Sequence, residues 1–329
     1  MPQMTTSDVH VSTALTNISI AYMQGADKFV ASRVFPNIPV AKKFDRYYTY
    51  DRGDFNRVEM RERAPGTESA GGGFGIDNTP TYSCRVFSVH KDIDEQLRAN
   101  ADSVLNVDRD AVNWLTLQAL LKRETMFATN YMASGVWTND WVGVASGPTG
   151  SQLLQWNDAN STPIEDIRKL RRSVLESTGF EPNKLTLGRS VFDALLDHPD
   201  IIDRLKAGQT PGGPAMADQY RLAQLFGVDE VLVMNAIQNT GKEGQAAAHS
   251  FIGGKKALLT YSPPQPGLLV PSAGYTFSWT GYLGAGAEGN RIKSIPMPWL
   301  EVQRLEIDMA MDQKVVAPDL GAFVNNAVA

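Results

Sequence analysis

The chain has 329 residues, of which 43% are hydrophobic, and its formal net charge is −5 at pH 7. This length predicts about two domains, and the apolar content is enough for a sizeable core. A net negative chain has no general electrostatic attraction to nucleic acid, which excludes binding of nucleic acid through overall positive charge. The single cysteine, Cys84, excludes an intramolecular disulfide and a cysteine-based zinc cluster.

The compartment is predicted to be a reducing one, as in the cytosol. Residues 1–8 lack the basic patch and apolar run of a signal peptide. The sequence contains no run of about 18 apolar residues, so no membrane-spanning helix is predicted. A single cysteine suits reducing conditions. We therefore expect no association with a membrane.

Residues 1–43 predict an N-terminal arm that has little capacity to form a core. A short amphipathic piece covers residues 18–29, and Pro36 and Pro39 after it favour extended backbone.

Residues 44–94 predict a long two-stranded hairpin. Apolar and polar residues alternate along 44–50 and 57–61 and again along 82–89, as is typical of strands with one half-buried face. Between the two arms, residues 64–75 are rich in glycine and have only Phe74 as an apolar anchor. A strand from residue 44 to 63 would reach roughly 60 Å. Because an isolated hairpin is at best marginally stable, we expect it to lie on another copy of the chain.

Residues 103–132 contain no proline or glycine and predict one long helix. Asn106 is the expected cap, and Asp108 and Asp110 fall in the first turn, where carboxylates suit the helix dipole. Such a helix would extend about 40 Å, which suits a structural spine.

The next part of the chain predicts a compact α/β layer, because helices alternate with short strands. Residues 139–160 are expected to form a loop. A capping box at Thr162 and Glu165 begins a helix that Gly179 ends, and Ser190 is expected to cap another. The expected strands are 184–187 and 228–234, with a helix at 217–226 between them and a loop at 210–214. Beyond residue 250, strands are expected at 257–261, 275–279 and 299–309.

A convergent catalytic or metal-binding set is not found in the sequence. The four histidines are His10, His90, His198 and His249, and they lack metal-ligand spacing. His198 lies at an expected helix end, and we interpret it as a cap or surface residue. No cofactor is expected.

The glycines at 284, 286 and 289 match the dinucleotide-binding pattern G-x-G-x-x-G. That mechanism requires a helix directly after the glycines to hold the pyrophosphate. Pro296 and Pro298 oppose a helix there, so we interpret this segment as a flexible loop between strands.

The outgoing arm of the hairpin also carries five arginines, interleaved with acidic residues so that its local charge is close to neutral. They are Arg46, Arg52, Arg57, Arg61 and Arg63. Two interpretations stay open: a solvated face, or salt bridges that set the register between subunits.

The order of these elements resembles the Hong Kong 97-type major capsid proteins of tailed double-stranded-DNA bacteriophages. Residues 44–94 match the extended loop and 103–132 the spine helix, while 182–199 and 222–233 resemble strand and helix passages of the axial domain. The resemblance implies an α+β fold with five parts: an N-terminal arm (1–43), an extended β-hairpin loop (44–94), a peripheral domain with the spine helix (95–160), an axial α/β domain (161–270), and return strands of the peripheral sheet with a C-terminal tail (271–329).

The resemblance implies a structural subunit that forms hexamers and pentamers in an icosahedral capsid around double-stranded DNA, which it does not bind sequence-specifically. It places the protein in the virion capsid, assembled in the host cytoplasm, and it implies no enzymatic activity. The partners implied are further copies of the chain, a portal and a separate scaffolding protein, and the presence of a decoration protein is left open. No lysine lies between Lys43 and Lys91, so an isopeptide crosslink from the hairpin is not expected.

The resemblance also implies inter-subunit contacts from the hairpin and the arm. The hairpin residues are Arg57, Glu59, Arg61, Glu62, Arg63, Glu68 and Phe74. The arm residues are Phe29, Val34 and Phe35.

Two alternatives stay open. The first is an encapsulin-like nanocompartment shell of the same fold that encloses a protein cargo. The second is an unrecognised α/β enzyme that uses Asp193, Asp197 and His198, for which no acid–base set is evident.

Overall fold

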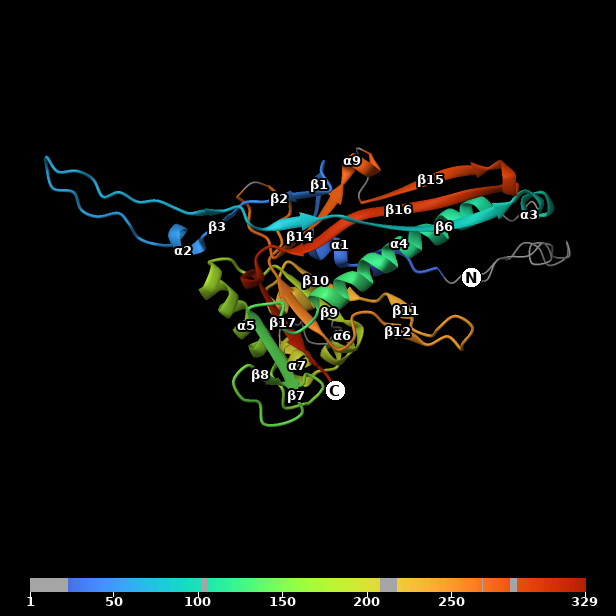
Figure 1. Cartoon of the computed structure of the whole chain (residues 1–329). Coiled ribbons are helices and arrows are strands. Elements are labelled where there is room, and N and C mark those ends of the chain that lie inside the picture. Colours follow the sequence, from blue (N-terminus) through green and yellow to red (C-terminus); the bar gives the residue numbers. More distant parts are fainter. Residues whose placement is uncertain (1–22, 102–105, 208–217, 268, 285–288) are drawn as a thin grey trace.

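A computed structural model describes residues 23–101, 106–207, 218–267, 269–284 and 289–329. The molecule combines an elongated sheet, a second sheet covered by helices, and a hairpin that projects far from both (Figure 1). Several predicted features lie outside the described residues: the first part (18–22) of the piece at 18–29, the helix start at 103–105, the loop at 210–214 and the glycine-pattern residues 285–288. The described helices contain no segment that is long and apolar enough to cross a membrane.

The elongated sheet, called the peripheral sheet here, is organised around one central strand, β16 (Val302–Val315). Along one edge β16 pairs with β6 (Arg85–Asp94), and along the other with β15 (Asn290–Met297) and then β14 (Gly274–Trp279). The parallel strand β1 (Asn37–Val40) extends the sheet beyond β14. β15 was not predicted, and β16 begins three residues later than the predicted strand because Trp299 lies in a turn, η2 (Pro298–Leu300).

The two faces of the peripheral sheet differ in chemistry because side chains alternate along β16. Leu305, Ile307 and Met309 point to the face that the spine helix covers. On the other face, Asp308 is buried and accepts hydrogen bonds from Ser88 Oγ at 2.6 Å and Tyr282 OH at 3.1 Å. This face is held by ion pairs between neighbouring strands.

The predicted spine helix is confirmed as α4 (Val107–Tyr131), which runs beneath the peripheral sheet (Figure 1). The predicted cap is also confirmed, because Asn106 Oδ1 accepts a hydrogen bond from Arg109 N at 2.9 Å. Its 25 residues give a length of about 37 Å. The short helix α3 (Glu95–Asn100) lies at the far end of the sheet.

The second sheet, called the axial sheet here, has six strands in the described part of the chain. The strand order is β10 (Glu230–Met234), β9 (Lys184–Gly188), β13 (Ala257–Thr260), β17 (Gly321–Asn325), β7 (Asn139–Val144) and β8 (Gln152–Leu154). The helices are α5 (Pro163–Thr178), α6 (Arg189–Leu196), α7 (Pro199–Ala207) and α8 (Gln219–Phe226). The sheet is covered by α5, α6 and α8, and α7 packs on α5 and α6. Gly179 ends α5 at a φ of 78°, as predicted.

Several expectations for this layer were wrong. Residues 139–160 contain β7 and β8 rather than only a loop, because the C-terminal strand β17 supplies a partner from far along the chain. β7 and β17 therefore belong to the axial sheet, although the predicted division placed residues 139–154 and 321–325 with the peripheral part. The capping box is not formed, since the Thr162 side chain makes no cap hydrogen bond with a described residue. Ser190 lies inside α6, and Gly188 is the cap position.

Several smaller elements also occur in the described chain. A second hairpin, β11 (Ile237–Asn239) and β12 (His249–Phe251), was not predicted. α1 (Ala31–Val34) follows a turn, η1 (Ala26–Lys28), and α9 (Thr280–Leu283) follows β14. A last turn, η3 (Pro318–Leu320), leads into β17. No helix directly follows the glycine pattern in the described residues, as Pro296 and Pro298 predicted, and strand β15 begins at Asn290.

Candidate assembly interface

The predicted hairpin is present, but its strands are short and lie only near its base. β2 (Phe44–Arg46) pairs with β5 (Thr81–Ser83), and β3 (Thr49–Tyr50) pairs with β4 (Ile76–Asp77). A single helical turn, α2 (Arg52–Phe55), follows β3. Beyond this point both arms extend into solvent, away from the rest of the molecule (Figure 1).

The predicted strand at residues 57–61 was wrong. Val58 is 90% exposed and Met60 is 93% exposed, and the described residues around them form neither strand nor helix. Alternation of apolar and polar residues creates a strand only where a neighbouring strand and an apolar surface are present. The single chain supplies neither a partner strand nor an apolar surface at residues 57–61. These residues would form a strand only against a surface that another molecule supplies.

The base of the hairpin is fixed to the peripheral sheet by aromatic stacking. The ring of Tyr82 stacks on Phe277 of β14 with 4.7 Å between centroids, and Tyr47 stacks there at 5.8 Å. Ser83 N donates to Asp312 at 2.9 Å, and Cys84 is buried beside these rings. Burial raises the pKa of the Cys84 thiol to about 11, so this cysteine is a neutral core residue.

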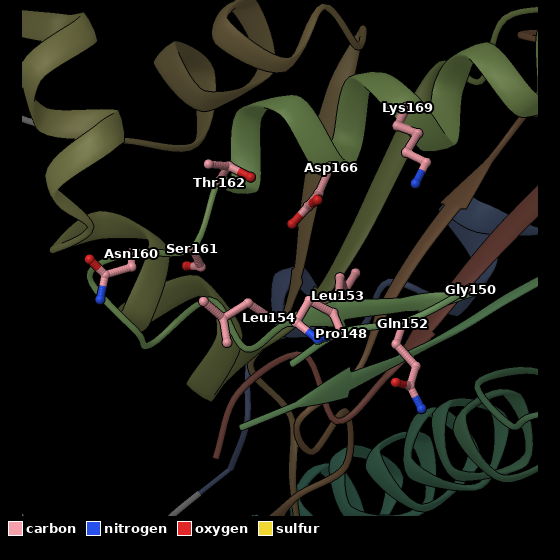
Figure 2. A pocket seen from close by; sticks show the side chains of 10 residues that line it. All are labelled: Pro148, Gly150, Gln152, Leu153, Leu154, Asn160, Ser161, Thr162, Asp166 and Lys169. Carbon is pink, nitrogen blue, oxygen red and sulfur yellow. The ribbon is translucent and has the colours of Figure 1, made fainter. Parts of the chain in front are cut away.

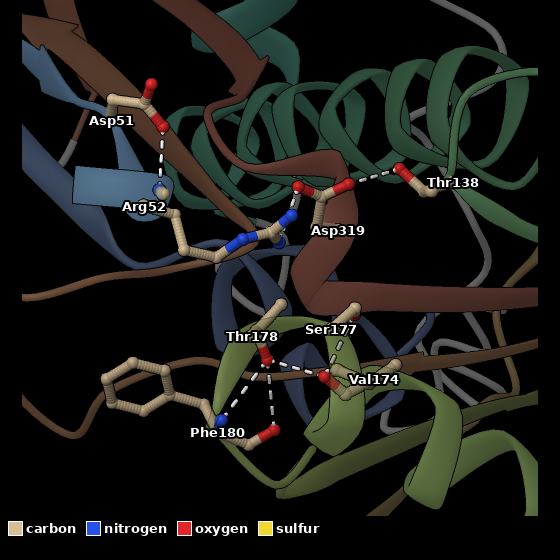
Figure 3. A network of polar contacts seen from close by, with 9 residues as sticks. Asp51, Arg52, Thr138, Val174, Ser177, Thr178, Phe180 and Asp319 are labelled. Atoms are coloured by element: carbon tan, nitrogen blue, oxygen red, sulfur yellow. Dashed lines mark hydrogen bonds and ion pairs between the residues drawn. The ribbon is translucent and has the colours of Figure 1, made fainter. Parts of the chain in front are cut away.

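A second anchor joins the hairpin to the C-terminal part of the chain. Arg52 Nη1 lies 2.9 Å from Asp319 Oδ2, and the other oxygen of Asp319 accepts from Thr138 Oγ1 at 2.6 Å (Figure 3). Asp51 caps α2 by accepting from Gly53 N at 2.7 Å. The hairpin therefore leaves the molecule at a defined position.

Three aromatic side chains form an exposed cluster, called the hairpin aromatic cluster here, where the arms leave α2. The centroid of Phe55 lies 5.8 Å from that of Tyr50 and 5.4 Å from that of Phe74, and Tyr50 and Phe74 are 6.0 Å apart. All three stay exposed. The sequence analysis selected Phe74 but missed Tyr50 and Phe55, although the density of aromatic residues along 44–55 was a visible signal.

The charged hairpin residues selected from the sequence lie on the projecting arms. Arg57 makes a long ion pair with Asp54 at 3.8 Å, and Arg63 Nε donates to the Thr67 carbonyl. The exposed members are Arg57, Arg61, Glu62, Arg63 and Glu68, and Glu59 is half-buried. Their inter-subunit contacts stay a prediction, and both interpretations of their charge remain open.

The arm residues selected from the sequence lie elsewhere. Phe29, Val34 and Phe35 are all buried within this chain. The ring of Phe35 meets Phe127 of the spine helix edge-on at 5.2 Å. Contact of these side chains with a second subunit stays a prediction, but the single chain argues against it because little of their surface is free.

Two of the three candidate catalytic residues, His198 and Asp193, have structural partners in the described chain, and Asp197 is exposed. His198 Nδ1 accepts from Asp200 N at 3.2 Å in the first turn of α7, and Nε2 lies 3.0 Å from Ser161 Oγ. Of the two interpretations of His198, a cap or a surface residue, the cap agrees with this hydrogen bond, whereas the surface position was wrong because the side chain is buried. Asp193 pairs with Arg189 on α6 at 2.8 Å. No group of three or more histidine, cysteine or acidic residues in the described ranges could hold a metal ion.

A hollow near the start of α5 also lacks a catalytic set of side chains. Figure 2 shows Asp166 and Lys169 at its rim on α5, with Ser161 and Thr162 just before the helix. Asp166 accepts a hydrogen bond from Trp156 Nε1 at 3.1 Å, and burial raises its pKa. The Lys169 ammonium lies over the ring of Trp141 at 4.4 Å. These groups have structural partners, and together they form no acid–base pair.

Comparison with known proteins identifies relatives of the chain. The family described as phage major capsid protein E matches residues 154–269. The chain is 28% identical to the major capsid protein of Pseudomonas phage JBD67 over 338 residues, covering 99% of this chain and all of that protein. It is 24% identical to the major capsid protein of Burkholderia phage BcepMu, covering 82% of this chain and 84% of that protein.

Solved structures share the fold. The capsid structure of cyanophage P-SCSP1u matches with a TM-score of 0.63 at 10% identity, covering 98% of this chain and 95% of that one. The SrpI encapsulin of Synechococcus elongatus PCC 7942 matches with a TM-score of 0.57 at 11% identity, covering 99% and 96%. The predicted resemblance to phage major capsid proteins and the Hong Kong 97-type fold are confirmed, and with them the role of a structural capsid subunit.

Proposed function

We propose that this capsid subunit assembles through its projecting hairpin, as hexamers and pentamers, into an icosahedral shell around double-stranded DNA. One observation carries the proposal. Of 19 large apolar side chains that are exposed among the described residues, nine lie between Phe44 and Val86. Exposed apolar groups concentrated on one projecting element mark an interaction surface, and a second copy of the chain is the partner that a capsid subunit provides.

The proposal assigns a mechanical role and no catalytic one. The stacked base holds the hairpin in place, while the hairpin aromatic cluster and the charged arms lie across a neighbour. Apolar burial would supply most of the affinity, and the mixed charges would set the register. A net negative chain suits a container for DNA, because a strongly basic lining would bind phosphates tightly.

We also propose that a scaffolding protein, a portal and packaged DNA are partners of this subunit, and that it is assembled in the host cytoplasm and remains in the virion. The encapsulin match keeps a second candidate open, in which the shell encloses protein. The contents of the shell, DNA or protein, distinguish the phage capsid from the nanocompartment.

Electron microscopy and size-exclusion chromatography of the purified chain, with and without a candidate scaffold, test the proposal. Closed shells or capsomer-sized rings are the expected result. Nuclease-resistant DNA in shells purified from infected cells supports the phage role, whereas a protein cargo supports the nanocompartment. A monomer or dimer under both conditions would overturn the assembly proposal. Uniform shells without any scaffold would overturn only the proposed scaffolding partner.

A further inference from the structure

The segment around α1 lies between the two main layers of the molecule. Val30, Ala31, Val34 and Phe35 are all buried in one core cluster. That cluster also contains Phe127, Ala128 and Met132 from the spine helix, and Leu232, Met234 and Leu258 from the axial sheet. The α1 segment (residues 30–35) therefore packs between the spine helix and the axial sheet. We call this segment the wedge, and the contact region around it the joint.

Charged side chains hold the two ends of this wedge. Glu124 of the spine helix is buried, and its carboxylate accepts hydrogen bonds from Ala31 N at 2.9 Å and from Val30 N at 3.1 and 3.2 Å. At the other end, Lys184 Nζ of β9 donates to the Arg33 carbonyl. A carboxylate at the first N–H groups and an ammonium at the last carbonyls are both in favourable positions for a helical turn.

The joint also buries polar groups that a permanent core would avoid. Leu185 and Leu187 point into the helix-covered core of the axial layer, so Lys184 and Thr186 point to the opposite face, toward the wedge. The hydroxyls of Thr186 and Thr260 are buried, and neither has a hydrogen-bond partner among the residues that the structure describes. Burial lowers the pKa of Lys184, so its charged form is also disfavoured there.

We propose that the α1 segment is a detachable wedge, and that the charge on Glu124 controls how firmly it docks between the spine helix and the axial sheet. The buried polar groups would recover hydration when the wedge leaves, which lowers the cost of opening this joint relative to an all-apolar core. The inference goes beyond shell assembly, because it concerns a movement within one subunit.

The direction of the pH effect follows from the site. Burial raises the pKa of Glu124 to about 7, against the opposing effects of the Ala31 and Val30 N–H groups and of Arg123. Once undocked and hydrated, the carboxyl would titrate near its ordinary value of 4.5. The docked state therefore binds the proton more tightly, so docking is strongest at acid pH and weakens as the pH rises through about 7.

The other charged groups around the joint have partners of their own. Arg33 on α1 pairs with Glu230 on β10, and Lys184 is held by the Arg33 carbonyl. On the peripheral sheet, Asp312 of β16 accepts from the backbone at Ser83. Glu124 is therefore the group expected to give the joint a pH dependence near neutrality.

Hydrogen exchange measured by mass spectrometry on the purified full chain tests the proposal, with rates corrected for intrinsic exchange at each pH. In peptides covering residues 29–36, protection is expected to fall by roughly tenfold to a hundredfold between pH 5 and 8.5. Peptides covering β9 and β13 are expected to change much less. Protection of residues 29–36 that does not depend on pH would overturn the proposal.

Three variants make the test specific. E124Q keeps the shape but cannot ionise, so the pH dependence at residues 29–36 is expected to disappear. K184Q keeps Glu124, so its protection is expected to be lower at every pH with the slope unchanged. The control E165Q alters an exposed glutamate that pairs loosely with Arg204 at 3.5 Å, and it is expected to match the wild type. A wild-type slope in E124Q would overturn the role of Glu124, whether or not the chain forms shells. If E124Q does not fold, K184Q decides: unchanged protection in it would contradict the wedge.

Discussion

The hairpin and the axial sheet are rich in the same kinds of side chain, but they place them in opposite environments. In the axial layer, Trp156, Phe192 and Phe226 are buried against strands and helices of the same chain. In the hairpin, Tyr50, Phe55 and Phe74 contact each other and stay exposed. These residues of the axial layer find their packing partners within one chain, whereas the apolar surface of the hairpin stays exposed in the single chain, where we propose that a second copy covers it. Stability should therefore depend on the first region and assembly on the second.

The largest expected effect comes from removing the end of the hairpin. Replacing residues 64–75 with two glycines should abolish or greatly reduce shell formation, because the arms lose their reach over a neighbour. The subunit should stay folded, since these residues are all exposed. Circular dichroism reports folding, and electron microscopy with the scaffold present reports assembly.

A second variant with a Gly-Ser sequence of equal length separates reach from side chains. If shells form with this variant but not with the deletion, the length of the hairpin, and not the side chains at its end, is what assembly requires. Normal shells from the deletion would contradict the proposed role of the hairpin.

The opposite pattern is expected for the core of the axial layer. Phe226 on α8 is buried in this core, so Phe226→Ala should lower the free energy of unfolding by about 3–5 kcal/mol. Urea denaturation followed by fluorescence measures this loss. Phe55→Ala in the hairpin is the matched control, and it should change stability by less than about 0.5 kcal/mol. Equal losses from the two variants would mean that the two regions do not differ as described.

The contrast between the axial layer and the hairpin also explains which structural features could be predicted from the sequence. Local signals predicted the elements that are stabilised locally: Asn106 begins the spine helix and Gly179 ends α5, as expected. The hairpin was also recognised, because its length and alternation are local features. Its strand at residues 57–61 was wrong because alternation does not report whether a partner strand exists.

Long-range pairing and burial were not visible in the sequence. β7 pairs with β17, which lies about 180 residues further along the chain, so residues 139–144 lacked any local sign of a partner. The burial of Val34 and Phe35 was missed because Pro36 and Pro39, which follow them, favour extended backbone, and a single helical turn is too short to show a periodic pattern. In the candidate interface, Phe74 was found because it is alone in a glycine-rich tip, while Tyr50 and Phe55 were absorbed into a strand pattern.

The peripheral sheet allows a smaller test, because its polar face is stabilised within the chain as the axial core is. Burial raises the pKa of Asp308, but hydrogen bonds from Lys293, Ser88 and Tyr282 outweigh this effect and bring it to about 2. Since the folded pKa lies below the ordinary value of 3.8, the stabilisation is complete above that value and is lost as the pH falls toward 2. Asp308→Asn should cost about 2 kcal/mol at pH 7 and much less at pH 2.

Thermal or urea unfolding at a series of pH values checks this difference. The control Asp193→Asn removes an exposed pair with Arg189, and it should cost less than about 0.5 kcal/mol. A cost for Asp308→Asn that does not change with pH would show that the carboxylate charge is not what stabilises this face.

The smallest effect is expected at the boundary between the two regions, where Arg52 ties the hairpin to Asp319. Both side chains are partly exposed, so Arg52→Ala should lower stability by less than about 1 kcal/mol. Its effect on assembly should be larger than its effect on stability, because losing this anchor lets the hairpin leave the molecule in many directions and raises the entropy cost of docking. Arg46→Ala, an exposed arginine nearer the base, is the matched control. If Arg52→Ala and Arg46→Ala assemble equally well, the stacked rings of Tyr82 and Phe277 alone are enough to direct the hairpin.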